Sequence, residues 1–225
     1  MAAKEALEVV KRILCFGDSN TWGANPADGS RHPSDLRWSG ILQKELGEAY
    51  LVIEEGYNGR TTVFDDEIEG RLSGLKYFAP CIESQSPLDM IIIMLGTNDL
   101  KTRFGVEAGT IAFGLNRYLK AVQAVFGNCP KVLLAAPILI DPAYKNHPLF
   151  YDMFGDGAYE RSKGFAKAYE AMAGAAGIYY MNAADFAKAS SEDGIHMDAG
   201  EHEKLGRAFA SRVKEILAKG ANSYE

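Results

Sequence analysis

The sequence predicts an α/β protein with three layers, in which helices cover both faces of a five-stranded parallel sheet. Two observations support this expectation. Five short apolar runs lack any alternation of apolar and polar residues, which is typical of strands covered on both faces. Stretches with apolar residues at helical spacing lie between these runs. Strands that alternate with helices form right-handed βαβ units, so we expect an α/β/α sandwich.

The five apolar runs are the expected strands. They are Ile13–Phe16, Leu51–Ile53, Met90–Leu95, Val132–Ala136 and Ile178–Met181. The longest of them, Met90–Leu95, is far shorter than the roughly 20 residues that a transmembrane helix needs. We therefore expect strands of a buried sheet and no membrane partner.

Four stretches have the features of helices. Two of them are followed directly by Gly47 and Gly127, and glycine is common just after the last turn of a helix. The expected helices are Asp35–Leu46, Glu107–Phe126, Tyr159–Ala175 and Glu201–Ala218. Two long segments, Val63–Ser86 and Leu139–Ala158, have no clear assignment. Long loops over one edge of a sheet would shape a binding site there.

The composition indicates one ordinary globular domain that spans residues 1–225. The chain is 47% hydrophobic and 24% charged, and it contains no repeat, low-complexity tract or linker-like segment. Its 24 Lys and Arg residues against 30 Asp and Glu residues give a net charge of −6. No segment supplies the basic cluster that a phosphate backbone requires, so nucleic acid is excluded as an expected partner.

The cysteines indicate a reducing environment. Cys15, Cys81 and Cys129 form an odd, sparse set without a Cys-x-x-Cys pair, so neither a disulfide framework nor a zinc ribbon is expected. The segment 1–12 lacks the long apolar centre of a secretory signal. Together these features favour the cytoplasm.

Polar segments follow the expected strands at the edge of the sheet where chemistry is normally found. In open parallel sheets, ligands bind beyond the carboxyl ends of the strands. Three such segments are Gly17–Asn20, Gly56–Gly59 and Gly96–Asp99, and a fourth, Asp193–His196, precedes the last expected helix. These four segments hold the candidate site residues.

Ser19 is the candidate nucleophile. It follows the first expected strand directly, and a serine at a strand-to-helix turn exposes its hydroxyl near the free N–H groups of the helix. Taken alone, Gly-Asp-Ser-Asn fits a polar turn with a helix N-cap better than it fits a nucleophile. A phosphate-binding loop is excluded, because neither Gly-x-Gly-x-x-Gly nor Gly-Lys-Ser/Thr is present.

Asp193 and His196 are candidates for the acid and the base. Their spacing lets the carboxylate contact Nδ1 of the imidazole, which fixes the tautomer and leaves Nε2 free to accept a proton. A single histidine before a helix is more often structural or solvated, so the pair taken alone is a weak signal. His202 is expected to be exposed, and reading His196, Asp198 and His202 as metal ligands is disfavoured because their spacing matches no standard site.

Asn98, Gly59 and Ser19 can supply hydrogen-bond donors for an oxyanion. The amide NH₂ of Asn98 follows the most apolar strand, and Gly59 can bring a backbone N–H close because it lacks a Cβ. The N–H of Ser19 would be the third donor. Each residue also fits a simple turn. What favours the chemical interpretation is that all the pieces fall where one sheet edge could bring them together.

The same residues resemble the sequence blocks of the SGNH hydrolases, also called GDSL-type esterases. The blocks correspond in order to Gly17-Asp18-Ser19, Gly59, Gly96-Thr97-Asn98-Asp99 and Asp193-Gly194-Ile195-His196. The longer segments CFGDSNTWG, VIEEGYNGRTT, IIIMLGTNDLK and DGIHMDAGEHEKLG resemble the arylesterase-like, acyl-transferring branch of that family. The resemblance extends from Arg12 to Gly206. It departs from the family label at Asn20, where the label has leucine.

The resemblance implies a flavodoxin-like sandwich (the SGNH hydrolase fold), no metal and no organic cofactor. It implies that Ser19 is the nucleophile, His196 the base and Asp193 its orienting acid. It also implies that the Ser19 N–H, the Gly59 N–H and the Asn98 side chain form the oxyanion hole.

The expected function is hydrolysis of a small-molecule ester, with a short-chain acyl group or an aryl alcohol, through an acyl-enzyme. This branch of the family also implies acyltransferase or perhydrolase activity where another acceptor competes with water. A carbohydrate acetyl esterase or a thioesterase would use the same residues. A non-catalytic flavodoxin-like binding module is the alternative from a different class, and it would not require Ser19, His196 and Asp193 to meet.

The segment 139–158 suggests a homo-oligomer. It combines many aromatic and aliphatic residues with proline and glycine, which is unusual for a free loop. The segment could form a lid or a subunit contact, or it could fold back over its own core. Because the related arylesterase-like proteins are oligomeric, we expect subunits that share walls at the active site.

Overall fold

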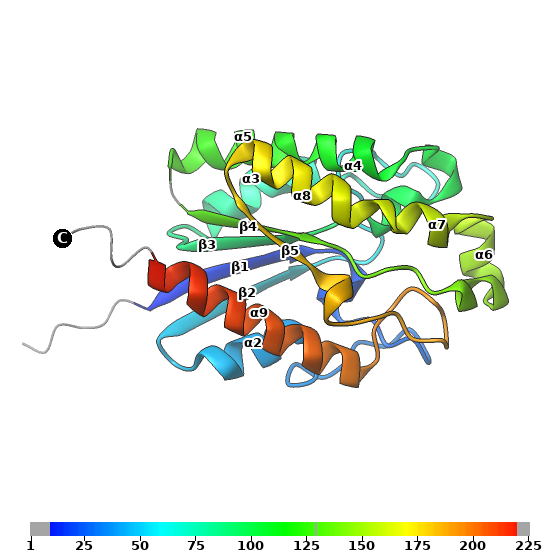
Figure 1. Cartoon of the computed structure of the whole chain (residues 1–225), viewed down its shortest axis with the longest axis horizontal. Helices are drawn as coiled ribbons and strands as arrows, with labels where there is room; N and C mark the ends of the chain where they lie inside the picture. The colour runs from blue at the N-terminus through cyan, green and yellow to red at the C-terminus, as the bar shows by residue number, and fades with distance from the viewer. Residues whose placement is uncertain (1–9, 129, 220–225) are drawn as a thin grey trace, which may run out of the picture.

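The computed structural model describes residues 10–128 and 130–219, and its centre is a five-stranded parallel sheet (Figure 1). The strands follow the order β2-β1-β3-β4-β5, which is the order of flavodoxin-like sheets. Their bounds are Lys11–Gly17 for β1, Tyr50–Gly56 for β2, Met90–Met94 for β3, Lys131–Ala136 for β4 and Tyr179–Asn182 for β5. All five expected strands and the expected fold class are confirmed. The sequence features expected of Cys129 and of residues 1–9 lie outside the described residues.

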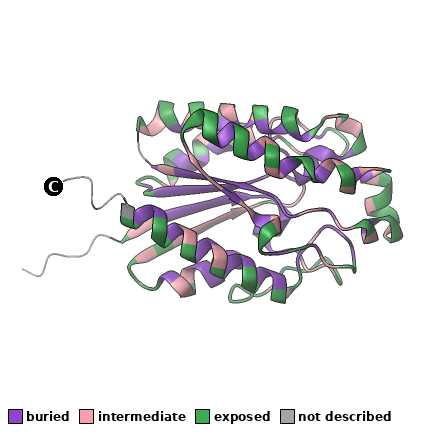
Figure 2. Cartoon of the chain, viewed as in Figure 1, coloured by how far each residue is buried: buried purple, intermediate pink, exposed green. Residues whose placement is uncertain are grey.

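The sheet separates two apolar cores because its strands are buried on both faces. In β1, Leu14 and Phe16 point into one core, whereas Ile13 and Cys15 point into the other. Such a strand cannot alternate apolar with polar residues, which explains the continuous apolar runs. Figure 2 shows the consequence, since the strands in the centre are largely buried and the outer faces of the helices are exposed.

Helices cover both faces of the sheet. One layer consists of α2 and α9, which pack against each other, and the opposite layer contains the packed pairs α3 with α5 and α4 with α8 (Figure 1). The bounds of the longer helices are Trp38–Leu46 for α2, Gly74–Ser84 for α3, Ala108–Gly114 for α4, Asn116–Phe126 for α5, Gly164–Ala176 for α8 and Ala199–Lys219 for α9.

Short helices lie mostly around the carboxyl ends of the strands, where α6 and α7 are visible beyond the sheet in Figure 1. Their bounds are Ser19–Trp22 for α1, Pro148–Phe154 for α6 and Ala158–Ser162 for α7. The 3₁₀ helices are η1 (Thr97–Leu100), η2 (Thr102–Phe104), η3 (Pro142–Asn146) and η4 (Ala183–Asp185). This crowding places many chain segments around one edge of the sheet.

The structure corrects two expected helices, each of which is divided into two. In the first, the Asn116 amide donates to Phe113 O (3.0 Å), just where α4 ends and α5 begins. In the second, the Ser162 hydroxyl donates to Tyr159 O (2.7 Å), where α7 gives way to α8. Side chains that bond backbone carbonyls three residues earlier compete with the helical pattern.

The two segments without assignment also contain helices. In the first of them, α3 forms although Pro80 lies inside it, because Phe78, Cys81 and Ile82 are buried against the sheet. In the second, η3 and α6 form. Burial of apolar side chains therefore outweighs the local signals against a helix.

Across residues 10–128 and 130–219, no helix is both long enough and apolar enough to span a membrane.

Candidate active site

Ser19 is the first residue of α1 and follows the end of β1 after one residue. Asp18 is the N-cap, and its Oδ1 accepts a hydrogen bond from Asn20 N at 3.0 Å. Burial raises the pKa of the Asp18 carboxyl to about 6. The first N–H groups of a helix have no acceptor within the helix, so Ser19 offers both a hydroxyl and a backbone donor at this point.

His196 and Asp193 meet Ser19 in the fold. His196 Nε2 lies 2.9 Å from Ser19 Oγ, and His196 Nδ1 lies 2.6 Å from Asp193 Oδ2. The other carboxylate oxygen, Oδ1, accepts hydrogen bonds from Ile195 N (2.8 Å) and His196 N (2.9 Å). The carboxylate is therefore fixed by the backbone of the histidine loop, and an alcohol, an imidazole and a carboxylate lie in one line.

Asn98 and Gly59 line the same hollow as Ser19 and His196. Asn98 lies in η1, and its Nδ2 donates to Arg60 O at 3.2 Å, which leaves the second amide hydrogen available. Gly59 has a φ of +75°, and a Cβ there would approach Arg71 Nε and Glu69 Oε2 to 2.8 and 2.9 Å. Any larger residue at this position would be strained and would crowd the hollow.

The loop of Gly59 is tied to the turn of Asn98 by a residue that the sequence analysis did not single out. The buried Asp99 accepts hydrogen bonds from the N–H of Thr62 (3.0 Å) and from its hydroxyl (2.5 Å). Burial raises the pKa of Asp99 to about 7. The sequence does contain a signal for this residue, because Asp99 follows Asn98 directly in the segment Gly96–Asp99.

Arg60 holds the same loop against β1. Its Nη1 donates to Gly17 O (2.7 Å) and to Glu55 O, and its guanidinium lies 4.1 Å from the ring centroid of Phe16. Burial lowers the pKa of Arg60. The sequence alone did not indicate this role, because it depends on contacts between residues distant in the chain.

Apolar residues of α6 form one wall of the hollow. Phe150, Met153 and Phe154 line it, and the ring of Phe150 lies edge-on to His196 with centroids 5.6 Å apart. The hollow has a volume of about 200 Å³. Part of the segment 139–158 therefore folds over its own core, with Tyr144 buried, and part of it limits the space above Ser19.

Charged residues form another part of the lining, a polar rim. Lys101 is 2% exposed and its Nζ lies 2.6 Å from Glu69 Oε1. Burial lowers the pKa of the Lys101 ammonium. Arg71 also lines the hollow, and its Nε lies 3.5 Å from Glu69 Oε2. The sequence alone does not indicate this rim, because its residues come from separate loops.

His202 does not lie exposed as expected. Its side chain is fully buried, and its Nδ1 accepts a hydrogen bond from Trp38 N (3.3 Å) at the start of α2. Burial lowers the pKa of His202 to about 3, so the imidazole is neutral. The expected exposure of His202 is wrong because α9 packs on α2, and this tertiary contact cannot be read from the sequence near His202. Among the described residues, no group of three His, Cys, Asp or Glu side chains could hold a metal ion.

The chain is similar to known proteins of one family. Residues 15–203 match the model of the GDSL-like lipase/acylhydrolase family. A search of curated protein sequences gave no match.

Several solved structures are similar over nearly the whole chain. An inhibitor-bound aryl esterase from M. smegmatis is 37% identical, with a TM-score of 0.85 over 91% of this chain and 99% of that one. Est24, a carbohydrate acetylesterase from Sinorhizobium meliloti, is 38% identical, with a TM-score of 0.85 over 92% of this chain and 99% of the other. A lipase/acylhydrolase from Enterococcus faecalis, 21% identical with a TM-score of 0.65 over 92% and 96% of the two chains, shares the fold.

Proposed function

Since the chain belongs to the GDSL-like lipase/acylhydrolase family, has the SGNH hydrolase fold and is a carboxylic ester hydrolase, we propose that Ser19, His196 and Asp193 are its catalytic triad. The observation that carries this proposal is the continuous line of contacts, 2.9 Å from Ser19 Oγ to His196 Nε2 and 2.6 Å from His196 Nδ1 to Asp193 Oδ2. A binding module would have no need of this line.

The mechanism has two steps. Ser19 Oγ attacks the ester carbonyl while His196 Nε2 takes the hydroxyl proton, and Asp193 stabilises the resulting imidazolium. The alcohol then leaves with that proton, and an acyl group stays on Ser19. Water attacks the acyl-enzyme with His196 as the base, which releases the acid and regenerates the serine.

The oxyanion of each step needs fixed donors. We assign this role to the N–H of Ser19, the N–H of Gly59 and the Nδ2 of Asn98. Support comes from their common place around the hollow and from the bonds of Asn98 and Asp99, which fix the donors before substrate arrives. Donors that need no reorganisation stabilise the transition state most effectively.

The substrate is an ester of a short acyl group. A hollow of about 200 Å³, closed on one side by Phe150 and Met153, leaves room for few carbon atoms. The similarity to an aryl esterase supports an aryl alcohol. The similarity to a carbohydrate acetylesterase, together with the polar rim of Lys101, Glu69 and Arg71, supports an acetylated sugar as a second candidate.

Transfer of the acyl group to other acceptors is part of the same proposal. An alcohol, or hydrogen peroxide, that enters the hollow in place of water would make the enzyme an acyltransferase or a perhydrolase. A thioester would be cleaved by the same residues. The ratio of transfer to hydrolysis is measured with p-nitrophenyl acetate in the presence of a competing alcohol.

The central experiment is labelling of the native protein with a fluorophosphonate, followed by peptide mass spectrometry. We expect modification of Ser19, and protection of Ser19 by a slow acetyl ester. Absence of labelling in an otherwise folded protein would contradict the triad. A series of p-nitrophenyl esters from acetate to octanoate then measures the size limit, and we expect kcat/KM to fall beyond short chains.

The state of assembly and the location of the enzyme belong to the proposal as well. Leu149 is 59% exposed and Tyr151 is 39% exposed on α6, beside the wall of the hollow, which supports a homo-oligomer with subunits near the site. Light scattering at micromolar concentration tests this. Cys15 and Cys81 are free and buried, which supports a cytoplasmic enzyme, and cell fractionation tests that location.

A further inference from the structure

Asn20, the residue directly after Ser19, connects the two parts of the site. It is 2% exposed, and its Nδ2 donates to Ile195 O at 3.1 Å. Its Oδ1 accepts a hydrogen bond from Met197 N, also at 3.1 Å. The two backbone groups that it contacts therefore lie on either side of His196. One amide side chain joins the helix of the serine to the loop of the histidine.

The backbone of Asn20 is also held in place, on the side of β1. Its N–H donates to Asp18 Oδ1 at 3.0 Å, and it lies within α1, which follows directly from the central part of the sheet. The amide is thus anchored next to Ser19, at the turn that follows β1. A displacement of the histidine loop would break both bonds of the amide.

The remaining backbone groups of the histidine loop are bonded elsewhere. Asp193 Oδ1 accepts from the N–H of Ile195 and of His196, and His196 O accepts from Ser190 N at 2.8 Å. These bonds hold the loop together but do not connect it to Ser19. Besides the contact of the imidazole with the Ser19 hydroxyl, the bonds of Asn20 tie the loop to α1.

We propose that Asn20 is a positioning residue that sets the distance and direction between Ser19 Oγ and His196 Nε2. The inference rests on the triad proposed above, and Asn20 itself touches neither substrate nor reacting atoms. The two contacts in this chain need an amide, because one group donates to Ile195 O and the other accepts from Met197 N. Leucine has neither group, and an ionised aspartate would turn an acceptor toward Ile195 O.

The test compares Asn20→Leu with the wild-type protein. Because a misplacement of about 1 Å can reduce turnover about 100-fold, we expect kcat for p-nitrophenyl acetate to fall about 10- to 100-fold while KM changes less than about threefold. The rate of fluorophosphonate labelling at Ser19 should fall by a similar factor. Asn20→Asp, which keeps the size and one acceptor, should lose activity in the same direction and serves if Asn20→Leu does not fold.

Val213→Ala is the matched control for lost stability. Val213 is fully buried in the core between α9 and the sheet, so truncation destabilises the fold without touching the site. We expect this variant to keep its kcat at a temperature where it is folded. If it loses as much activity as Asn20→Leu, or if folded Asn20→Leu keeps kcat within twofold, the inference is wrong.

The labelling experiment tests the triad and the role of Asn20 separately. If the wild-type protein itself is not labelled at Ser19, the proposed function fails whatever Asn20 does. If the wild type is labelled and Asn20→Leu is labelled at the same rate, only the positioning role fails.

Discussion

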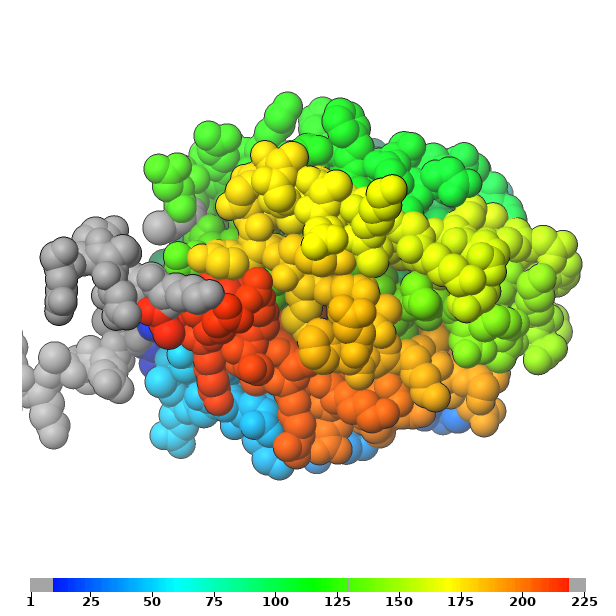
Figure 3. Space-filling model, in the orientation of Figure 1, coloured from blue at the N-terminus to red at the C-terminus, as the bar shows by residue number. Residues whose placement is uncertain are grey.

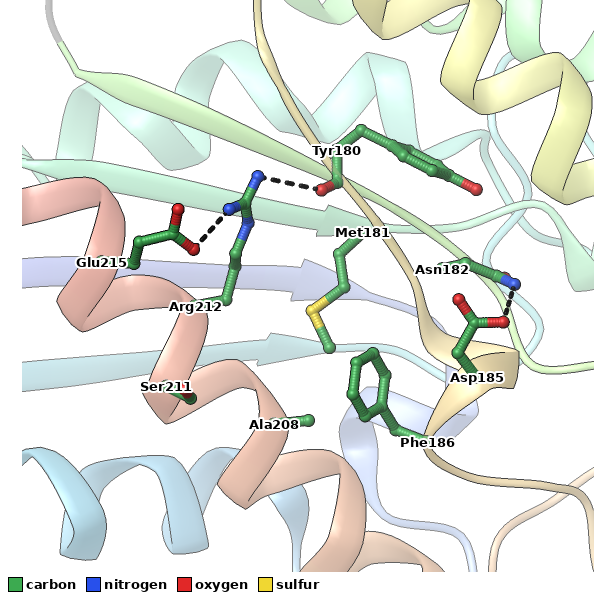
Figure 4. Close-up of a pocket in the computed structure, with 9 residues that line it drawn as sticks. All are labelled: Tyr180, Met181, Asn182, Asp185, Phe186, Ala208, Ser211, Arg212 and Glu215. Atoms are coloured by element: carbon green, nitrogen blue, oxygen red, sulfur yellow. Dashed lines mark hydrogen bonds and ion pairs between the residues drawn. The ribbon is translucent and has the colours of Figure 1, made fainter.

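Two hollows of this molecule differ in what their residues can do. The one above Ser19 has a volume of about 200 Å³, and a second one, between β5 and α9, has about 400 Å³. The larger hollow lies at the open edge of the sheet, on the face shown in Figure 3, where the segment after β5 lies against α9. It also contains a serine, Ser211, with charged and amide side chains around it (Figure 4).

The polar groups of the larger hollow are bonded to one another. Figure 4 shows Arg212 with Glu215 (2.5 Å) and Asn182 with Asp185 (2.7 Å). No histidine is among the described residues that line it, so no imidazole is present there to take the proton of Ser211. In the smaller hollow, the bonds form a directed line from Asp193 through His196 to the hydroxyl of Ser19. Volume therefore does not identify the site, whereas the direction of the hydrogen bonds does.

The strongest test of this comparison replaces each of the two serines by alanine, in two separate variants. Ser19→Ala should reduce kcat/KM for p-nitrophenyl acetate by at least about 10³-fold, because no nucleophile remains. Ser211→Ala should leave it unchanged within about twofold. Both variants should show the circular dichroism of the wild type. Equal activity of the two variants would mean that the proposed nucleophile is wrong.

A second test compares the two asparagines that flank these hollows. Asn98→Ala removes a proposed oxyanion donor, and we expect kcat to fall about 10²- to 10³-fold with little change in KM. Asn182→Ala removes only the bond to Asp185 and should keep full activity. A loss below twofold in Asn98→Ala would remove this side chain from the oxyanion hole.

Two positions in α9 offer a third test, on stability. His202, near its start, is buried with a pKa of about 3 instead of 6.5. Between these values the unfolded chain binds a proton that the folded protein does not, so the free energy of unfolding falls as the pH falls below 6.5. Between pH 7 and pH 5, the protonation of His202 in the unfolded chain lowers the free energy of unfolding by about 2 kcal/mol.

The variant His202→Asn keeps an acceptor for Trp38 N but cannot be protonated in this range. Its loss of stability between pH 7 and pH 5 should be smaller than that of the wild type by about 2 kcal/mol, measured by urea unfolding. Asp18 and Asp99 have raised pKa values, so they shift stability in the opposite direction, but they do so in both proteins. Identical pH dependence in the two proteins would contradict a neutral, buried His202.

The smallest effect is expected in the second half of α9. The side chain of Arg212 is 31% exposed and pairs with Glu215 beside the larger hollow. Partly exposed ion pairs contribute little, so Arg212→Gln should change the free energy of unfolding by less than about 1 kcal/mol and leave activity unchanged. A large loss of activity would show that the second hollow takes part in function.

Most of the sheet could be predicted from the sequence because buried parallel strands leave a local mark. All five apolar runs coincide with strands, within a few residues at each end. The prediction of the helices was less complete. The helix α3, which contains Pro80, was not predicted. The side-chain bonds of Asn116 and Ser162 divide two helices that the apolar spacing predicted as continuous. These features depend on bonds whose formation the apolar pattern does not reveal.

The sequence by itself determined the strand positions, the candidate residues and the family, because these follow from short motifs and local periodicity. It could not show that His202 is buried, that Asn20 contacts the residues on both sides of His196, or that α6 limits the space above Ser19. Each of these depends on two segments far apart in the chain that only the packed sheet brings within hydrogen-bond or van der Waals distance. Tertiary packing decided them because burial against a distant element sets both the pKa of a buried side chain and its partners.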